Sequence, residues 1–260
     1  MKITRCRTPL GTFYGRIDND VIHLFEGDPF GDQRPIGEIP YENATLLCPC
    51  EPSKIIGVGI NYAPHARELE FEIPQEPLIF LKPPSSLLNP GEAIQLPRES
   101  GQVEYEGELA VVIGRPAKDL SEENARSAIF GFTCFNDVTA RDLQKKDVQF
   151  TRSKSFDTFS AVGPWIETDL NPDNVTLETW LNGERKQHAN TQTMIRSVAT
   201  LISFISQVMT LLPGDIIATG TPAGVGRLHP GDTVSVTIEK IGTLTNSVDR
   251  RLISETECIS

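Results

Sequence analysis

The sequence lacks any apolar run long enough to cross a bilayer. Its longest apolar runs, such as Leu109 to Ile113, are far shorter than the ~20 residues that a membrane-spanning helix needs. The first residues, MKITRCR, contain no apolar block of the kind that a signal peptide carries. The sequence therefore predicts a cytoplasmic protein.

Cysteine is also scarce. The five cysteines are odd in number and scattered along the chain, at Cys6, Cys48, Cys50, Cys134 and Cys258. The two in Cys48-Pro-Cys50 are too close together for the usual zinc knuckle, and no second Cys or His pair completes such a site. We therefore expect free structural thiols in a reducing compartment.

Basic residues are outnumbered. The chain has 24 Lys and Arg against 35 Asp and Glu, a formal net charge of −11. Nucleic acids and anionic membranes need a basic surface, so both are excluded as partners. A small anionic substrate is not excluded, because salt screens distant surface charge over roughly 8–10 Å and a few cations in a pocket outweigh it.

The chain is long enough, at 260 residues, for one sizeable core and one or two domains. Residues 1–50 predict a small N-terminal β-rich region of short strands and turns. Strands at 12–17 and 21–25 flank a hairpin turn, and residues 27–41, rich in Gly, Pro and Asp, predict a loop. The boundary falls near residues 50–53, and residues 51–260 form the predicted catalytic domain.

The second region is rich in short strands that do not alternate regularly with helices. This pattern predicts an α+β fold, a mixed β-roll, and not a Rossmann sheet. Helices are expected over 65–70, 122–128 and 198–209, with another that begins near residue 139. Strands are expected over residues 54–58, 77–81, 103–114, 130–135, 216–218, 233–238 and 243–248.

Three acids alternate along one expected strand. Side chains alternate in a strand, so Glu104, Glu106 and Glu108 share one face. A bare acidic face of this kind is usually solvated. Here it continues directly into Leu109 to Ile113, which is apolar on both faces, so at least Glu108 should be half buried. Because unpaired buried carboxylates cost several kcal/mol each, a cation is expected, and all-oxygen ligation favours Mg²⁺, Mn²⁺ or Ca²⁺ over zinc.

Asp137 strengthens this metal hypothesis. It lies at the C-terminal end of the expected strand 130–135, just before a helix, where ligands are often bound. An N-cap of that helix is an equally good local interpretation.

Two further sets of residues have chemistry suited to catalysis. His65 and Glu68 are three apart on a helix, so the carboxylate can orient the imidazole as a general base for water. An ordinary surface ion pair is the commoner arrangement for such a pair. Lys82, Arg141 and Lys154 are candidate cations for a substrate carboxylate or a developing enolate, although each could equally be a solvated surface charge.

The small-residue loop Gly220 to Gly226, GTPAGVG, lets backbone amides approach a ligand closely. It lacks the Lys-Ser/Thr of a P-loop, which argues against a nucleotide.

Together these segments resemble the fumarylacetoacetate hydrolase family. Six motifs occur in the family's order and cover about residues 54 to 250. They are GVGINYAPH (57–65), FLKP (80–83), YEGELAVVIG (105–114), FNDVTARD (135–142), KSFDT (154–158) and PGDIIATGTPAGVG (213–226). The resemblance extends to small single-domain members of three types: acylpyruvate hydrolases, 2-hydroxyhepta-2,4-diene-1,7-dioate isomerases and oxaloacetate decarboxylase-tautomerases.

The resemblance implies the family's mixed β-roll, a homodimer and a site for Mg²⁺ or Mn²⁺, with Ca²⁺ as a possible substitute. It also assigns roles to individual positions. The metal ligands are Glu106, Glu108 and Asp137, the water-activating pair is His65 and Glu68, and the catalytic lysine is Lys154. The substrate contacts are Arg141, Gln144 and Thr221, and we expect Lys82 and Gly220 to contact substrate as well.

The substrate implied by the resemblance is a small anionic 2-oxo acid, which reacts through an enolate stabilised by the metal. Because both members of the water-activating pair are present, we expect hydrolysis of a carbon–carbon bond in an acylpyruvate such as fumarylpyruvate or acetylpyruvate. The alternatives are an isomerase or tautomerase of a 2-hydroxydienoate or oxaloacetate, and an oxaloacetate decarboxylase. A non-catalytic protein that is only stabilised by metal is disfavoured, since it would not need His65, Glu68 and Lys154.

Overall fold

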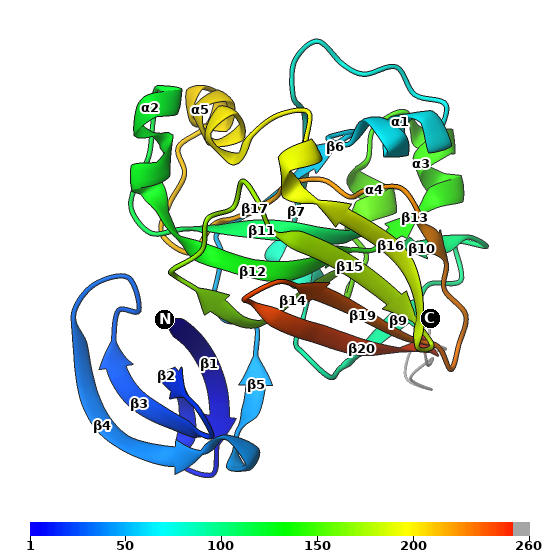
Figure 1. Ribbon diagram of the computed structural model, residues 1–260. Helices are drawn as coiled ribbons and strands as arrows, with labels where there is room; N and C mark the ends of the chain where they lie inside the picture. Colours follow the sequence, from blue (N-terminus) through cyan, green and yellow to red (C-terminus); the bar gives the residue numbers. More distant parts are fainter. Residues whose placement is uncertain (252–260) are drawn as a thin grey trace, which may run out of the picture.

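The computed structural model describes residues 1–251, and it is rich in strands with a few short helices (Figure 1). This confirms the α+β class. None of the described helices is long and apolar enough to cross a membrane. Cys6, Cys48, Cys50 and Cys134 are buried free thiols, as expected, whereas Cys258 lies outside the described residues.

The N-terminal strands pair in sequence and form the lobe at the lower left of Figure 1. Strand β1 also pairs with β14, so this lobe continues the largest sheet of the molecule. The short helix η1 (Tyr41–Asn43) precedes the last of these strands. The strands are β1 (Lys2–Thr8), β2 (Gly11–Asp18), β3 (Val21–Gly27), β4 (Gln33–Pro40) and β5 (Thr45–Leu47).

Strand β4 corrects the prediction of a loop over residues 27–41. It pairs with β3 along its whole length, from Val21↔Pro40 to Gly27↔Gln33. It is the outer strand of the sheet and mostly exposed, so it carries no alternating apolar pattern. An outer strand also tolerates Pro35 and Pro40, because one edge of its backbone needs no partner.

The largest sheet continues through the rest of the chain in the order β1-β14-β12-β11-β17-β6-β7, with β8 paired to β14. Strand β11 is at its centre and is buried on both faces, as its apolar sequence predicts. The strands are β6 (Ile55–Gly59), β7 (Leu78–Lys82), β8 (Leu87–Leu88), β11 (Gly107–Ile113), β12 (Ile129–Asp137), β14 (Ser160–Glu167) and β17 (Ile216–Ala218).

A second sheet packs against the centre of the first (Figure 1). The main core lies between the two, where Leu109 and Val111 of β11 join Leu177, Val236 and Leu244 of the second sheet. Two of its strands, β15 and β16, form a hairpin that the sequence did not predict, and β14 was not predicted either. The second sheet has the order β16 (Glu184–Asn190), β15 (Thr176–Leu181), β19 (Thr233–Ile238), β20 (Gly242–Arg250) and β9 (Ala93–Leu96).

The helices lie in two places. α2 (Glu122–Ala125), η3 (Arg126–Ala128) and the amphipathic α5 (Val198–Val208) cover one end of the sheets, and Ser197 caps α5 by accepting from the Thr200 N–H. α1 (Ala63–Glu68), α3 (Arg141–Asp147) and α4 (Thr151–Lys154) gather on the side opposite the N-terminal lobe (Figure 1). Two short turns, η2 (Pro84–Ser86) and η4 (Thr191–Thr193), complete the set.

The expected single strand over residues 103–114 is in fact two strands. β10 (Val103–Tyr105) belongs to a separate three-stranded sheet with β13 (Thr139–Ala140) and β18 (Gly226–Arg227), and β11 belongs to the largest sheet. Glu106 lies at the break. Its N–H donates to the Asn136 side-chain oxygen at 3.0 Å, and its carbonyl accepts from the Asp137 N–H at 2.8 Å.

Because the Glu106 N–H is buried, removal of its acceptor leaves it unsatisfied. We therefore expect Asn136→Ala to lower the free energy of unfolding by about 1–3 kcal/mol, measured by urea denaturation. Asn171→Ala is the control, since that exposed amide also accepts a backbone N–H, from Asp173, and its loss should cost less than about 0.5 kcal/mol. Equal effects of the two substitutions would contradict the role of Asn136.

Candidate metal centre and active site

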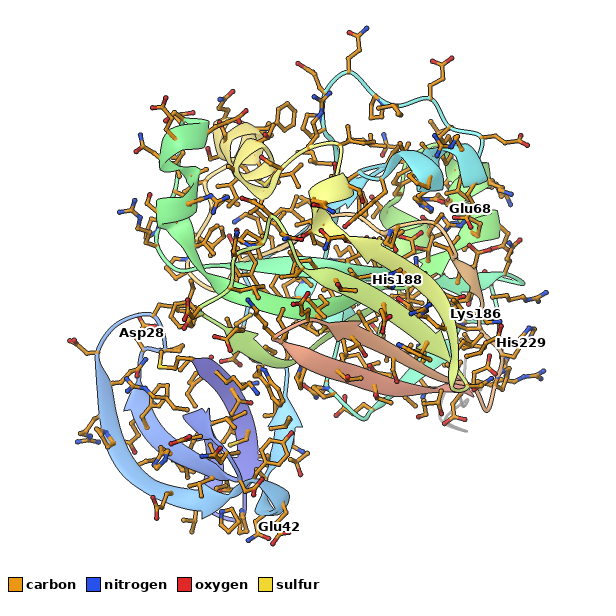
Figure 2. The ribbon with its side chains drawn as sticks, viewed as in Figure 1. Asp28, Glu42, Glu68, Lys186, His188 and His229 are labelled. Atoms are coloured by element: carbon orange, nitrogen blue, oxygen red, sulfur yellow. The ribbon has the colours of Figure 1, made fainter. Side chains whose placement is uncertain are left out.

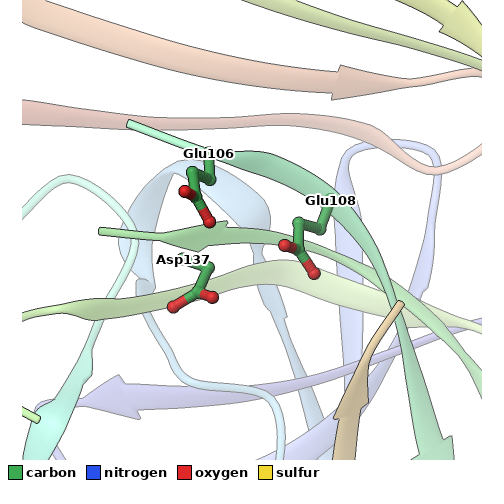
Figure 3. Close-up of side chains that lie close together, drawn as sticks. All are labelled: Glu106, Glu108 and Asp137. Atoms are coloured by element: carbon green, nitrogen blue, oxygen red, sulfur yellow. The ribbon is translucent and has the colours of Figure 1, made fainter. Parts of the chain in front are cut away.

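Three acidic side chains meet where β10, β11 and β12 come together. Antiparallel pairing sets Gly107 opposite Asn136, which places Glu106 beside Asp137 and leaves Glu108 on the same side of β11. One carboxylate oxygen from each of these acids lies within 4.8 Å of the others, and all three residues are buried (Figure 3). The structure thus brings together the three residues that the sequence suggested as metal ligands.

The charges around these acids are unevenly balanced. Burial alone would raise the pKa of Glu106, but Lys154 and Arg141 outweigh burial and hold that pKa below its usual range. Burial, Asp137 and Glu106 together raise the pKa of Glu108 well above its usual range. Among the described side chains Glu108 has no cationic partner, and its only hydrogen bond comes from the Gly220 N–H at 2.8 Å. A divalent cation fits this donor set, because hard oxygen ligands suit Mg²⁺ and Mn²⁺ and the added charge would stabilise Glu108.

Two buried lysines flank the acids. The Lys154 ammonium donates to Glu106 Oε2 at 2.7 Å and to Asp137 Oδ2 at 2.6 Å. Lys82 donates to the other Asp137 oxygen and, at 2.7 Å, to the carbonyl of Phe159. Asp137 is therefore held by two cations. The alternative that it caps the next helix is wrong, since α3 begins at Arg141 and has no side-chain cap.

Arg141 separates the fourth acid from the other three. Its Nε donates to Glu104 Oε2 at 2.7 Å, while its two terminal nitrogens donate to Glu106 and Gln144. Glu104 therefore serves as an ion-pair partner of Arg141, a role that sequence reasoning missed. The only available signal was that Glu104 precedes the two ligand candidates on the same face.

His65 and Glu68 form a pair next to this cluster. His65 Nδ1 lies 3.0 Å from Glu68 Oε2, and His65 is buried at 4% exposure. The other oxygen of Glu68 accepts from the Gly224 N–H at 2.9 Å, so the carboxylate is fixed between α1 and the loop that follows β17. Figure 2 shows Glu68 at the outer end of α1. Glu68 itself is exposed, but the burial of the imidazole argues against an ordinary surface ion pair.

The loop at residues 220–226 holds part of the site in place through hydrogen bonds to β11. Gly220 has a φ of +97°, and a Cβ there would lie 2.7 Å from the Asn61 Cβ, so only glycine fits. The Thr221 hydroxyl donates to the Gly107 carbonyl at 2.8 Å and accepts from the Gln187 amide at 2.8 Å. The loop thus holds Glu108 and the start of β11 in place. Gln187, on the unpredicted strand β16, is a second residue that the sequence analysis missed.

One cavity collects most of the predicted residues. Its polar lining comes from His65, Glu106, Glu108, Arg141, Gln144, Lys154 and Thr221. Its apolar wall includes Ile60, Leu69, Phe71, Phe80 and Phe150. Glu68, Asp137 and Gly220 contact residues of the lining without lining the cavity themselves, and Lys82 contacts Asp137.

Two family models match the chain. The model for the fumarylacetoacetate (FAA) hydrolase C-terminal domain matches residues 54–249, and an Rv2993c-like N-terminal model matches residues 1–49. The chain therefore belongs to the fumarylacetoacetate hydrolase family, as its motifs predicted. Protein Rv2993c of Mycobacterium tuberculosis is 46% identical and aligns over 96% of this chain and 99% of its own length. The oxaloacetate tautomerase YisK of Bacillus subtilis is 43% identical over 76% of this chain and 70% of its own.

Solved structures confirm the family's fold. The structure of 2-hydroxyhepta-2,4-diene-1,7-dioate isomerase from Mycobacterium marinum has a TM-score of 0.91 at 46% identity and covers 96% of this chain and 99% of its own. Maleylpyruvate hydrolase from Sphingobium sp. SYK-6, in complex with manganese(II) and pyruvate, has a TM-score of 0.81 at 29% identity and covers 97% and 100% of the two chains. Members of the family thus include hydrolases and isomerases or tautomerases.

Glu108, which has no cationic partner among the described side chains, allows a test of the metal site. We expect Glu108→Gln to weaken Mn²⁺ binding by more than roughly 100-fold, since even changes beyond the direct ligands cost about 10- to 100-fold. Calorimetric titration of the metal-free protein measures the affinity. Glu99→Gln, at an exposed position, removes the same charge and should leave the affinity unchanged. Equal affinity in the two variants would refute Glu108 as a ligand.

Proposed function

We propose that this protein is a Mg²⁺- or Mn²⁺-dependent enzyme that hydrolyses a carbon–carbon bond in an acylpyruvate-type 2-oxo acid. The observation that carries the proposal is the His65–Glu68 pair, whose buried imidazole lines the same cavity as two of the acidic metal-ligand candidates and Lys154. A protein that used metal only for stability would have no need for such a pair at this position.

The proposed metal ligands are Glu106, Glu108 and Asp137. When bound there, a divalent ion supplies Lewis-acid polarisation of the 2-oxo acid's oxygens. Lys154 supplies a second positive charge. Burial lowers the pKa of Lys154, but Asp137 and Glu106 outweigh burial and raise it, so the ammonium stays protonated. Arg141 and Gln144 line the same cavity and offer donors to a substrate carboxylate.

His65 is positioned as the base. A carboxylate only accepts hydrogen bonds, so the proton on this ring belongs on Nδ1, which donates to Glu68. The other nitrogen, Nε2, then has a free lone pair. It has no hydrogen-bond partner among residues 1–251. This nitrogen is therefore suited to take a proton from a water molecule.

In the proposed reaction, water adds to the substrate before the carbon–carbon bond breaks. The water oxygen bonds to the distal carbonyl carbon of the acylpyruvate while His65 Nε2 takes a proton. The bond between that carbon and the methylene carbon then breaks, and its electron pair moves into the enolate of pyruvate. The enolate carbon then takes this proton back from His65, which regenerates the base, so the products are a carboxylic acid and pyruvate. Lys154 stabilises the negative charge of the enolate.

A second candidate is an isomerase or tautomerase of a 2-hydroxydienoate or of oxaloacetate. Two of the relatives at 43–46% identity, the 2-hydroxyhepta-2,4-diene-1,7-dioate isomerase and the oxaloacetate tautomerase, carry such names. Such reactions need only proton transfer between carbon and oxygen, and decarboxylation of oxaloacetate would yield the same enolate. His65 and Lys154 could serve all of them.

Substitution of the base tests the hydrolytic mechanism. We expect His65→Ala to lower kcat for pyruvate release by about 10²- to 10⁴-fold, because a general base contributes that much, while Mn²⁺ binding is unchanged. His188→Ala is a matched control. His188 also pairs with a glutamate, with Nδ1 3.1 Å from Glu178 Oε1, but on the exposed face of the second sheet (Figure 2). Unchanged turnover in His65→Ala would rule out the mechanism.

Separate detection of two products distinguishes the candidate reactions. The Mn²⁺-loaded protein should consume the enol absorbance of acetylpyruvate or fumarylpyruvate and release pyruvate in equal amounts. Oxaloacetate and a hydroxydienedioate serve as substrates for the alternative reactions. Loss of enol absorbance without pyruvate would reject both hydrolysis and decarboxylation in favour of tautomerisation or isomerisation.

A further inference from the structure

A second cavity lies near the C-terminal end of β20, away from the candidate active site. Four arginines line it: Arg98, Arg227, Arg250 and Arg251. His229 belongs to the same lining and lies at the edge of the molecule near the last described residues (Figure 2). The cavity has a volume of about 430 Å³, in the range of small-molecule sites. We call it the arginine pocket.

The backbone around the arginine pocket is fixed by pairing of distant segments. Arg250 of β20 is the parallel partner of Leu96 on β9, and the Arg251 N–H donates to the Leu96 carbonyl at 3.2 Å. Arg227 of β18 is the partner of Glu104 on β10. Sheet hydrogen bonds therefore hold three of the four arginines, and the pocket is built into the fold.

Among residues 1–251, no carboxylate lines this pocket. Three acids near the pocket form hydrogen bonds with groups other than the four arginines. Asp142 accepts from the Ser100 hydroxyl and the Gly101 N–H, and Asp232 accepts from the His229 N–H and the Asn182 amide. Glu104 is held by Arg141. Within residues 1–251, none of the four arginines forms a salt bridge with a carboxylate.

This arrangement is unexpected on charge grounds. In a chain with 24 basic and 35 acidic residues, surface arginines have ample opportunity to pair with acids. Four guanidinium groups around one cavity repel one another, and a bound anion would remove this repulsion. Guanidinium groups also present paired N–H donors that match the oxygens of phosphate and carboxylate groups.

The arginine pocket is separate from the candidate active site. The two cavities share no lining residue. Val103, at the start of β10, lines the arginine pocket, whereas Glu106, just beyond the end of β10, lines the active-site cavity. The apolar side chains of Leu96 and Leu228 also belong to the lining and would contact the carbon frame of a ligand.

We propose that the arginine pocket binds a small polyanion that carries two or more phosphate or carboxylate groups. The volume of the pocket favours a small molecule. The net charge of −11 disfavours a nucleic acid, whose binding needs a broad basic surface. This proposal does not depend on the reaction proposed above.

Calorimetric titration with two weakly chelating probes tests the proposal and its ligand class. Fructose 1,6-bisphosphate represents phosphate groups and propane-1,2,3-tricarboxylate represents carboxylate groups. We expect one or both to bind, more weakly at high salt. The double substitution Arg98→Gln and Arg250→Gln should raise Kd by about 10-fold or more, because it removes two charged donors. The probe that binds more tightly identifies the class.

Three controls make the result decisive. Arg7→Gln, at an exposed position on β1, should leave Kd unchanged. Lys154→Met should also leave it unchanged, since any binding in the active-site cavity would be lost there instead. Pyruvate release should be the same in the double variant as in the wild type. The proposal is overturned if neither probe binds at millimolar concentration, or if the double variant matches Arg7→Gln. It is also overturned if the double variant changes the oligomeric state, which would make the pocket a subunit contact.

Discussion

The rest of the site depends on one constraint: three buried carboxylates, of Glu106, Glu108 and Asp137, have oxygens within 4.8 Å of one another. Unpaired, each such group would cost several kcal/mol. Asp137 and Glu106 are stabilised by Lys154, and Lys82 and Arg141 each hold one of them further. These groups leave one acid, Glu108, without a cationic partner among the described side chains. The arrangement is therefore complete only with an additional positive charge.

The backbone is shaped by the same constraint. A continuous strand would direct Glu104, Glu106 and Glu108 to one face at the spacing of every second residue. The break after β10 instead turns Glu104 toward Arg141, while Glu106 stays beside Asp137. The N–H groups freed by the break are taken up by side chains of Asn136 and Gln187. The break in the strand thus lets the acids reach different partners, and side-chain acceptors satisfy the backbone N–H groups that the break leaves without strand partners.

Sequence patterns identified those parts of the site that depend on local order. Glu106 and Glu108 stood out because an acidic alternation ran into a strand that is apolar on both faces, and Asp137 because it ends a buried strand. Patterns could not show that Arg141 pairs with Glu104, since that contact depends on the register of β10 against β13. They also missed β4, whose exposed outer position carries no apolar alternation, and the hairpin β15–β16, whose polar sequence masks the buried Gln187. Local periodicity in the sequence does not predict the ends of strands that are set by tertiary contacts.

The charge of the buried cluster links the proposed metal to the proposed anionic substrate. Within the described part of the site, four carboxylates face three cationic side chains, so one negative charge is in excess when Glu108 is ionised. An anionic 2-oxo acid would be repelled by that cluster, and a divalent ion changes the excess to one positive charge, which attracts it. The arginine pocket has the opposite charge, since the residues of its lining that the structure describes include four arginines and no acid. On this balance the active site would attract anions only with the metal bound, whereas the arginine pocket would attract them with the protein's own charges. The groups in this balance are Glu104, Glu106, Glu108 and Asp137 against Lys82, Arg141 and Lys154.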